Sequence, residues 1–204
     1  MKIFYSLPNN FFLFISIGTF HIELSFDKAV GKYLDNSGGP HFLVESGILA
    51  SGSLRGFMEG KNYSRCRRVH SMFAIALQSL HFEAFLNQNS TTSKEEIKAF
   101  LTKLSSSESN NAKSLLQSIP VELDELYLQY HLYCKETLTG GHGPTAQYWM
   151  IYIKMIDDHR KLTRAVRTGD YMLYIQMLPQ FIKLFFTFNH QNYARWLTKL
   201  VLYF

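Results

Sequence analysis

The sequence of 204 residues contains few of the features that identify a secreted, metal-binding or membrane protein. It has only two cysteines, Cys66 and Cys134, which are too few for a disulfide framework or a cysteine-based metal site. We therefore expect two free thiols in a reducing compartment and an intracellular protein. No apolar run reaches the roughly 20 residues that a membrane-spanning helix needs.

The amino-terminal segment resembles a signal peptide only superficially. Lys2 precedes an apolar run at 11–17, but Pro8, Asn9 and Asn10 interrupt the front half of the segment. The apolar run is short, and no small-x-small cleavage site follows it. Because this three-part pattern is incomplete, we do not expect a cleaved signal.

Common catalytic motifs are missing as well. The sequence has no GxSxG nucleophile elbow, Walker phosphate loop, dinucleotide-binding glycine pattern or HExxH zinc motif. We therefore expect no cofactor and assign no catalytic residue. His21 and Glu23 are weak metal-site candidates, because alternate residues of a strand share a face. A third ligand is missing, so a histidine at the start of a helix, satisfied by backbone, is the favoured alternative.

The segment 153–170 contains adjacent acids and a histidine that also suggest a metal at first sight. Neighbouring helix positions point about 100° apart, so Asp157, Asp158 and His159 cannot converge on one ion. At helical spacing Asp157 can pair with Arg160 or Lys161, and Lys154 can pair with Asp157 or Asp158. We therefore predict an outer helix face that carries salt bridges.

Hydrophobic periodicity predicts a mainly α fold. The exception is the run FFLFISI at 11–17, which has the length and composition of a buried strand and passes through Gly18 into a helix. We expect helical caps at Ser51 or Ser53, at Asp170 and at Asn189. The predicted helices cover 21–34, 51–60, 64–85, 94–104, 121–138, 145–167, 171–187 and 189–204, and 41–49 is predicted as a short helix or a turn.

These elements predict a helical domain with one N-terminal strand, the remnant of a larger α/β fold. Three segments follow from the polar breaks: strand and helices at 1–89, a polar and partly flexible helical insert at 90–119, and an aromatic-rich helical part at 120–204. We expect one domain overall, since the chain is of single-domain length. The last four residues, VLYF, are apolar and carry no helix stop signal, so we expect a fragment of a longer protein.

The stretch GKNYSRCRRVH at 60–70 concentrates positive charge and contains no acid. If Asn62 or Ser64 caps a helix there, free backbone amides and arginine side chains together favour phosphate. Tyr63 has the chemistry to stack on a base. The predicted nucleic-acid-binding residues are Lys61, Tyr63, Arg65, Arg67 and Arg68.

The alternative interpretation of this stretch is a solvated first turn. Its arginines would then pair with Glu59 or Glu45, since cations at a helix start oppose the helix dipole. The net charge of +5 permits DNA or RNA as a partner without requiring it, although no acid follows Asp170.

Aromatic residues are abundant, with 17 Phe and 12 Tyr. At helical spacing they are typical of a core rather than of a ligand cage. The stripes are Tyr127, Tyr130 and Tyr133, and Phe181, Phe185, Phe186 and Phe188. Aromatics left exposed would favour a protein partner or self-association, which makes a helical interaction module the alternative function.

Four stretches resemble a large group of uncharacterised, repeat-associated proteins in animal genomes: ISIGTFHIELSFDKAVGKYLDNSGG, LVESGILASGSLRGFMEGKNYSRCRRVH, YWMIYIKMIDDHRKLTRAVRTGDYMLYIQMLPQF and NHQNYARWLTKL. This group looks like relics of DNA transposons, and the resemblance implies an RNase H-like transposase ancestry and a nuclear setting. The motifs GKNYSR, RTGD and NYARW, in this order, are the specific part.

The resemblance does not imply catalysis. RNase H-like nucleases align two metal ions with carboxylates on several elements, but Thr19 stands at the strand end where an acid is expected. We therefore expect a non-catalytic, transposon-derived fragment with residual nucleic-acid binding.

Overall fold

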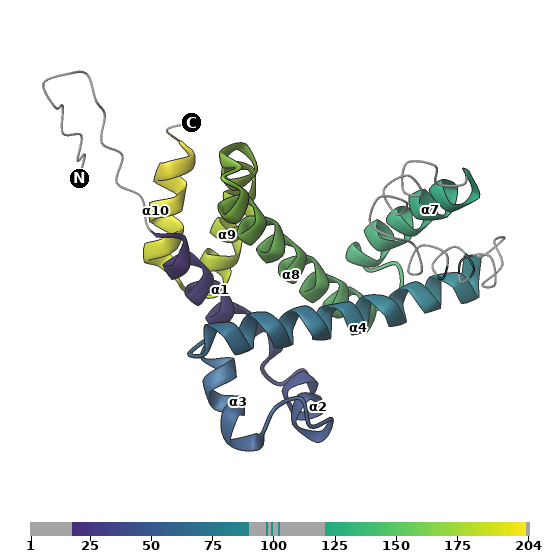
Figure 1. The fold of residues 1–204 in the computed structure, drawn as a ribbon, viewed down its shortest axis with the longest axis horizontal. Helices are drawn as coiled ribbons and strands as arrows, with labels where there is room; N and C mark the ends of the chain where they lie inside the picture. Colours follow the sequence, from purple (N-terminus) through teal and green to yellow (C-terminus); the bar gives the residue numbers. More distant parts are fainter. Residues whose placement is uncertain (1–17, 90–96, 98, 100–101, 103–120, 203–204) are drawn as a thin grey trace, which may run out of the picture. The chain divides into compact units, whose positions relative to one another are not determined.

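The computed structural model describes residues 18–89, 97, 99, 102 and 121–202, and every regular element among them is a helix (Figure 1). The prediction of a mainly α fold is therefore confirmed. The strand expected at 11–17 and most of the insert at 90–119 lie outside the described residues. No described helix combines the length and apolarity needed to cross a membrane.

The chain forms two compact units. Unit 1 comprises residues 1–72 and 154–204, and unit 2 comprises residues 73–153. Unit 1 contains α1 (Thr19–Leu34), α2 (Gly39–Glu45), α3 (Ser51–Met58), the start of α4 (Tyr63–Asn89), the end of α8 (Pro144–Thr168), α9 (Tyr171–Thr187) and α10 (Gln191–Val201). Unit 2 contains the remainder of α4 and α8 together with α7 (Val121–Leu138).

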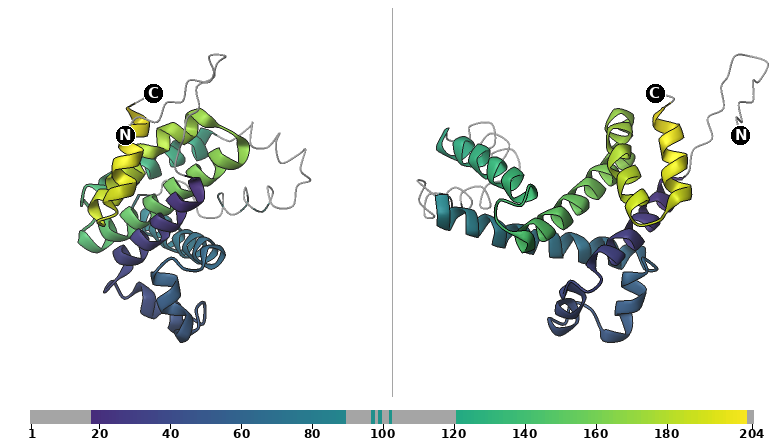
Figure 2. Two further views of the ribbon diagram at one scale, coloured as in Figure 1. Left: turned by 90° about the vertical axis from the view of Figure 1, so that its left-hand side faces the viewer. Right: turned by 180° about the vertical axis from the view of Figure 1, so that it is seen from behind.

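The core of unit 1 forms where α9 packs against α1 and α10, which Figures 1 and 2 show side by side. The ring of Phe26 on α1 lies 5.3 Å from that of Phe181 on α9. Phe185, one turn further along α9, lies 5.8 Å from Tyr193 of α10. Phe26, Phe181 and Phe185 are buried, and each side chain of this size stabilises the fold by about 1.5–3 kcal/mol.

A glycine allows α1 to approach α3 closely. A Cβ atom on Gly31 would lie 1.9 Å from the carbonyl oxygen of Met58, which is far inside contact distance. Only glycine leaves room for this backbone-to-backbone contact, so position 31 fixes how the short helix α3 sits on α1.

The core of unit 2 consists of Phe85 on α4 with Leu126 and Tyr133 on α7, flanked by Tyr130. Tyr127 differs from the sequence prediction, because 66% of its surface is exposed and it does not share the inner face. Tyr127 lies at the edge of the apolar stripe of α7, and the helical spacing of apolar residues does not determine whether a residue at such an edge is buried.

The cap predictions have mixed outcomes. The carboxylate of Asp170 accepts a hydrogen bond from the Leu173 N–H at 3.0 Å, which confirms the predicted cap of α9. The cap predicted at Ser51 or Ser53 is wrong, since α3 follows Ala50 without a side-chain cap. The cap at Asn189 is also wrong: with φ of 62° this residue ends α9 in the left-handed conformation.

Candidate functional site

The basic stretch begins at a tight backbone contact with α1. Gly60 has φ of 67°, and a Cβ there would lie 2.9 Å from the Lys28 nitrogen and 3.1 Å from the Asp27 Cβ. Asn62 then caps α4, because its Oδ1 accepts a hydrogen bond from the Arg65 N–H at 3.2 Å. The start of α4 is therefore held against α1 in a defined position.

The five residues predicted to bind nucleic acid occupy different environments. Lys61 and Arg68 are exposed, whereas Tyr63, Arg65 and Arg67 are half-buried. Lys61 forms an ion pair with Glu59. Tyr63 donates its hydroxyl hydrogen to the carboxyl group of Glu23, so the phenol is fixed rather than free to stack face-on.

The acids that could neutralise these arginines have other partners. Glu59 binds Lys61 and, at 2.9 Å, Arg55, and these hydrogen bonds lower the pKa of Glu59 to about 2. Glu45 lies 3.3 Å from His41. Within the described part of the chain, the predicted ion pairs between the arginines at 65, 67 and 68 and these acids do not form.

The end of α8 supplies a second group of arginines. Arg160, Arg164 and Arg167 are exposed and spaced at about one turn of helix. The predicted pairs of lysines and acids are confirmed beside them, with Lys154 and Asp158 2.9 Å apart and Lys161 and Asp157 2.6 Å apart. Lysines thus pair with both acids, and none of the three arginines has a carboxylate partner among the described residues.

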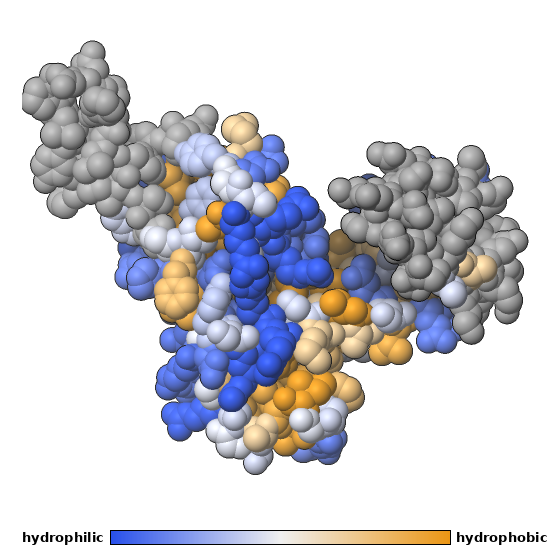
Figure 3. Space-filling view, in the orientation of Figure 1, coloured by the Kyte–Doolittle hydropathy of each residue, from blue (hydrophilic) through white to orange (hydrophobic). Residues whose placement is uncertain are grey.

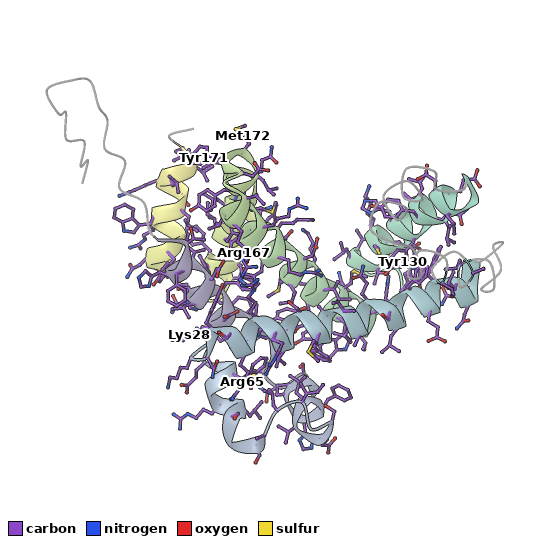
Figure 4. The ribbon with its side chains drawn as sticks, viewed as in Figure 1. Lys28, Arg65, Tyr130, Arg167, Tyr171 and Met172 are labelled. Atoms are coloured by element: carbon purple, nitrogen blue, oxygen red, sulfur yellow. The ribbon has the colours of Figure 1, made fainter. Side chains whose placement is uncertain are left out.

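We call the six arginines of α4 and α8 the arginine cluster: Arg65, Arg67, Arg68, Arg160, Arg164 and Arg167. Figure 3 shows strongly hydrophilic residues over the part of unit 1 that contains this cluster. Figure 4, drawn in the same view of the molecule, labels Arg65 and Arg167. Unit 1 contains 16 Lys and Arg against 8 Asp and Glu, a formal charge of +8. Unit 2 contains 5 against 8, a charge of −3. The positive charge is therefore concentrated in unit 1.

Polar side chains from α1, α4 and α8 meet inside unit 1. The carboxyl group of Glu23, which is 5% exposed, accepts hydrogen bonds from Tyr63 and from Thr163, the latter at 3.2 Å. We call this group the buried polar cluster; its members are the buried residues Glu23, Asp27, Cys66, His70, His159 and Thr163, together with the half-buried Tyr63.

Asp27 is the most unusual member of the buried polar cluster. Its side chain is fully buried, and neither carboxyl oxygen has a hydrogen-bond partner among the described residues. Burial raises the pKa of Asp27 to about 8, and the nearby Glu23 acts in the same direction. The carboxyl group is therefore mostly protonated at neutral pH, since an unpaired buried charge is costly.

The two histidines of the cluster are held neutral. His159 stacks on Phe26 with ring centroids 4.6 Å apart, and the ring of His70 lies 4.5 Å from that of Phe57. Burial lowers the pKa of His70 to about 3, assisted by His159, and lowers that of His159 to about 4, assisted by Arg67. Neither ring is protonated near pH 7, and the positive charge of Arg67 favours the neutral form of His159.

The thiol of Cys66 completes the cluster and donates to the carbonyl oxygen of Phe57 at 3.5 Å. Burial raises the pKa of this thiol to about 11, with a further contribution from Asp27. Cys66 is therefore an inert thiol at neutral pH rather than a nucleophile. Both Cys66 and Cys134 are free, as predicted.

The metal candidates are not brought together. His21 and Glu23 lie on α1 instead of a strand, so their side chains point in different directions, His21 exposed and Glu23 buried. Asp158 forms its predicted ion pair with Lys154, but the outer face predicted for this part of α8 is wrong for Asp158 and His159, which are 8% and 3% exposed. In the described ranges no three His, Cys, Asp or Glu side chains are arranged to hold a metal ion.

Sequence reasoning missed Asp27, His70 and Thr163 as members of a common cluster. A usable signal exists for the first of them. Asp27 stands between Phe26 and Ala29 on the apolar face of the helix predicted at 21–34, one turn after Glu23. An acid on an apolar helix face indicates a buried carboxyl group.

Comparison with known proteins gives one assignment. No curated protein and no solved structure matches the chain significantly. The family described as "Domain of unknown function (DUF8702)" matches residues 10–203, and thus both units and every helix described above. The protein therefore belongs to the DUF8702 family.

Proposed function

We propose that the protein binds nucleic acid through the arginine cluster of unit 1. The observation that carries this proposal is that six arginines on two adjacent helices have no carboxylate partner among the described residues, while nearby acids pair with lysines. A guanidinium group matches phosphate geometry with two parallel hydrogen bonds. The charge of +8 on unit 1 supports the same partner, because phosphate contacts dominate such affinity.

We further propose that the protein is a non-catalytic relic of a transposase with an RNase H-like ancestor. The motifs GKNYSR, RTGD and NYARW support this origin. The environment of the two acids on α1 supports a non-catalytic role. Glu23 is engaged by Tyr63 and Thr163, and Asp27 is sealed from solvent, so neither is presented to a nucleic-acid backbone.

The test of nucleic-acid binding is a comparison of two triple variants with the same charge. Replacing Arg160, Arg164 and Arg167 by Ala removes three arginines of the cluster. Replacing Lys183, Arg195 and Lys199 by Ala removes three exposed charges from α9 and α10 of the same unit. Binding of a fluorescent oligonucleotide is followed by anisotropy between about 50 and 200 mM salt.

We expect wild-type affinity to fall steeply with salt, with a logarithmic slope of about 0.9 for each phosphate that the protein neutralises. The α8 triple variant should bind at least about tenfold more weakly and with a smaller slope, and the α9–α10 variant should bind like wild type. Absence of wild-type binding at low salt would refute the proposal. Equally weakened binding in the two triple variants would show that general charge, and not the arginine cluster, is responsible.

A helical interaction module is the second candidate, favoured by an exposed apolar face on α7. Tyr127, Leu128 and Leu132 are each more than half exposed and follow helical spacing. Self-association through this face predicts a concentration-dependent mass in light scattering, abolished by Leu128→Glu. A monomer at all concentrations, with no change in Leu128→Glu, would reject self-association through this face.

A further inference from the structure

An exposed aromatic ring is connected to the arginine cluster through Tyr63. Phe20, in the first turn of α1, is 54% exposed although it belongs to a helix whose other aromatic residues are half or fully buried. Its ring lies 5.3 Å from that of Tyr63 in an edge-to-face arrangement, and 6.1 Å from the ring of His21. An exposed ring held by a second ring presents a flat apolar surface to solvent.

The support beneath this ring is rigid. Tyr63 is fixed by its hydrogen bond to Glu23, and Thr163 of α8 holds the other oxygen of the same carboxyl group. Three helices thus determine the position of the Tyr63 ring, and Tyr63 in turn contacts Phe20. A pre-positioned ring loses little conformational entropy on binding, which favours its use as a contact surface.

The charge beside Tyr63, the ring that supports Phe20, indicates which ligand Phe20 contacts. The guanidinium group of Arg67 lies beside the Tyr63 phenol, one helical turn along α4, and also acts on His159 of α8. Arg67 has no ion-pair partner in the described part of the chain. Phe20 and Arg67 thus both contact Tyr63, and an exposed aromatic ring combined with an arginine is how proteins hold a base and its phosphate in single-stranded nucleic acid.

We propose that Phe20 is a stacking platform for an unpaired base, and that the ligand of unit 1 is single-stranded nucleic acid. This inference rests on the proposed function and adds the class of nucleic acid. A duplex offers phosphates to the arginine cluster but keeps its bases stacked on one another, so Phe20 contributes only when a base is free. Phe20 should therefore control the preference for single strands over duplex, and the arginines should control affinity for both.

The experiment uses the full chain and three fluorescent probes of about 20 nucleotides: a single strand, the same strand in a duplex, and an abasic strand with equal phosphates. A ribonucleotide strand of the same sequence distinguishes RNA from DNA. Phe20→Ala is compared with Phe20→Trp, which retains a stacking ring. Phe186→Ala on α9 is the matched control, because Phe186 is also 54% exposed.

We expect Phe20→Ala to bind the single strand about tenfold more weakly while binding duplex and abasic strand unchanged. Phe20→Trp should retain the preference, and its tryptophan fluorescence should be quenched by the single strand beyond the change seen in wild type, which contains Trp149 and Trp196. If Phe20→Ala lowers affinity for all three probes equally, or for none, the stacking platform is wrong while arginine-dependent binding stands. If no probe binds the wild type, the proposed function itself fails.

Discussion

Tyr63 donates a hydrogen bond to the carboxyl group of Glu23, which lies 40 residues earlier in the chain, and thereby ties the start of α4 to α1. Thr163 donates to the other oxygen of the same group and adds α8. Glu23 is therefore the point at which three helices of unit 1 are joined by polar contacts within the buried polar cluster. Both helices of the arginine cluster are oriented by it.

Removing the Tyr63 hydroxyl should weaken this junction. Tyr63→Phe keeps the ring but leaves one buried oxygen of Glu23 without its donor, which costs about 1–3 kcal/mol of unfolding free energy. Urea denaturation followed by circular dichroism measures the loss. Tyr127→Phe is the control, because Tyr127 is 66% exposed and its hydroxyl removal should change stability by less than about 0.5 kcal/mol. Equal stability of Tyr63→Phe and wild type would contradict the role of the junction.

A pair of glycine substitutions tests the close approach of α1 and α3. Gly31→Ala places a Cβ 1.9 Å from the Met58 carbonyl oxygen, so the helices must separate, and we expect a loss of about 3 kcal/mol or more. Gly52→Ala on α3 meets no atom within 4 Å and should instead stabilise by up to about 1 kcal/mol through helix propensity. Thermal melting of the two variants should shift in opposite directions. A neutral Gly31→Ala would show that the helices do not touch at this position.

Stability should reach a maximum near pH 6.5. Asp27 has a folded-state pKa raised from 3.8 to about 8, so it opposes folding increasingly as pH rises through this range. His70 and His159 have folded-state pKa values lowered from 6.5 to about 3 and about 4, so their protonation in the unfolded state opposes folding below pH 6.5. Below pH 6.5 the protonation of two unfolded histidines outweighs the effect of one acid, and above it the deprotonation of Asp27 outweighs the histidines.

The decline above the maximum is specific to Asp27. Between pH 6.5 and 8 the unfolding free energy should fall by about 1 kcal/mol, because the proton held by folded Asp27 outweighs the protons that the unfolded histidines still bind. Asp27→Asn should abolish this decline and leave the loss below pH 6.5 in place. Urea denaturation across the pH range measures the fall in unfolding free energy both below and above pH 6.5. If the unfolding free energy of Asp27→Asn still fell above pH 6.5 as in wild type, another group would titrate in that range.

The cap of α9 offers a smaller and more local test. Asp170→Ala removes the acceptor of the Leu173 N–H and should lower stability by about 1 kcal/mol. Asp170→Asn retains a side-chain oxygen and should recover most of this loss. If both variants lose the same amount, the negative charge rather than the hydrogen bond is what stabilises the first turn of α9.

The helices could be predicted from sequence because their signals are local. Apolar residues at helical spacing, a glycine at 169 and an aspartate at 170 determine where α8 ends and α9 begins, and the structure follows them. The cap prediction for α3 was wrong because the helix begins after Ala50, whose side chain has no acceptor. The prediction at Asn189 was wrong because the left-handed backbone of this residue ends α9. The arginines of 60–70 were identifiable as a charged stretch, but their lack of acidic partners was not.

The order of residues is enough to specify a helical protein whose positive charge gathers in particular segments, since both properties depend on residue type and spacing along the chain. The meeting of Glu23, Tyr63 and Thr163 depends on tertiary packing, because these residues are up to 140 positions apart and come together only when α1, α4 and α8 pack. The same packing buries Asp27 and His159, pairs the nearby acids with lysines, and leaves Phe20 exposed beside Tyr63. The burial of side chains and the pairing of acids with lysines are properties of the assembled helices. They leave polar groups such as Asp27 and His159 inside unit 1 and, among the described residues, arginines without a carboxylate partner on its surface.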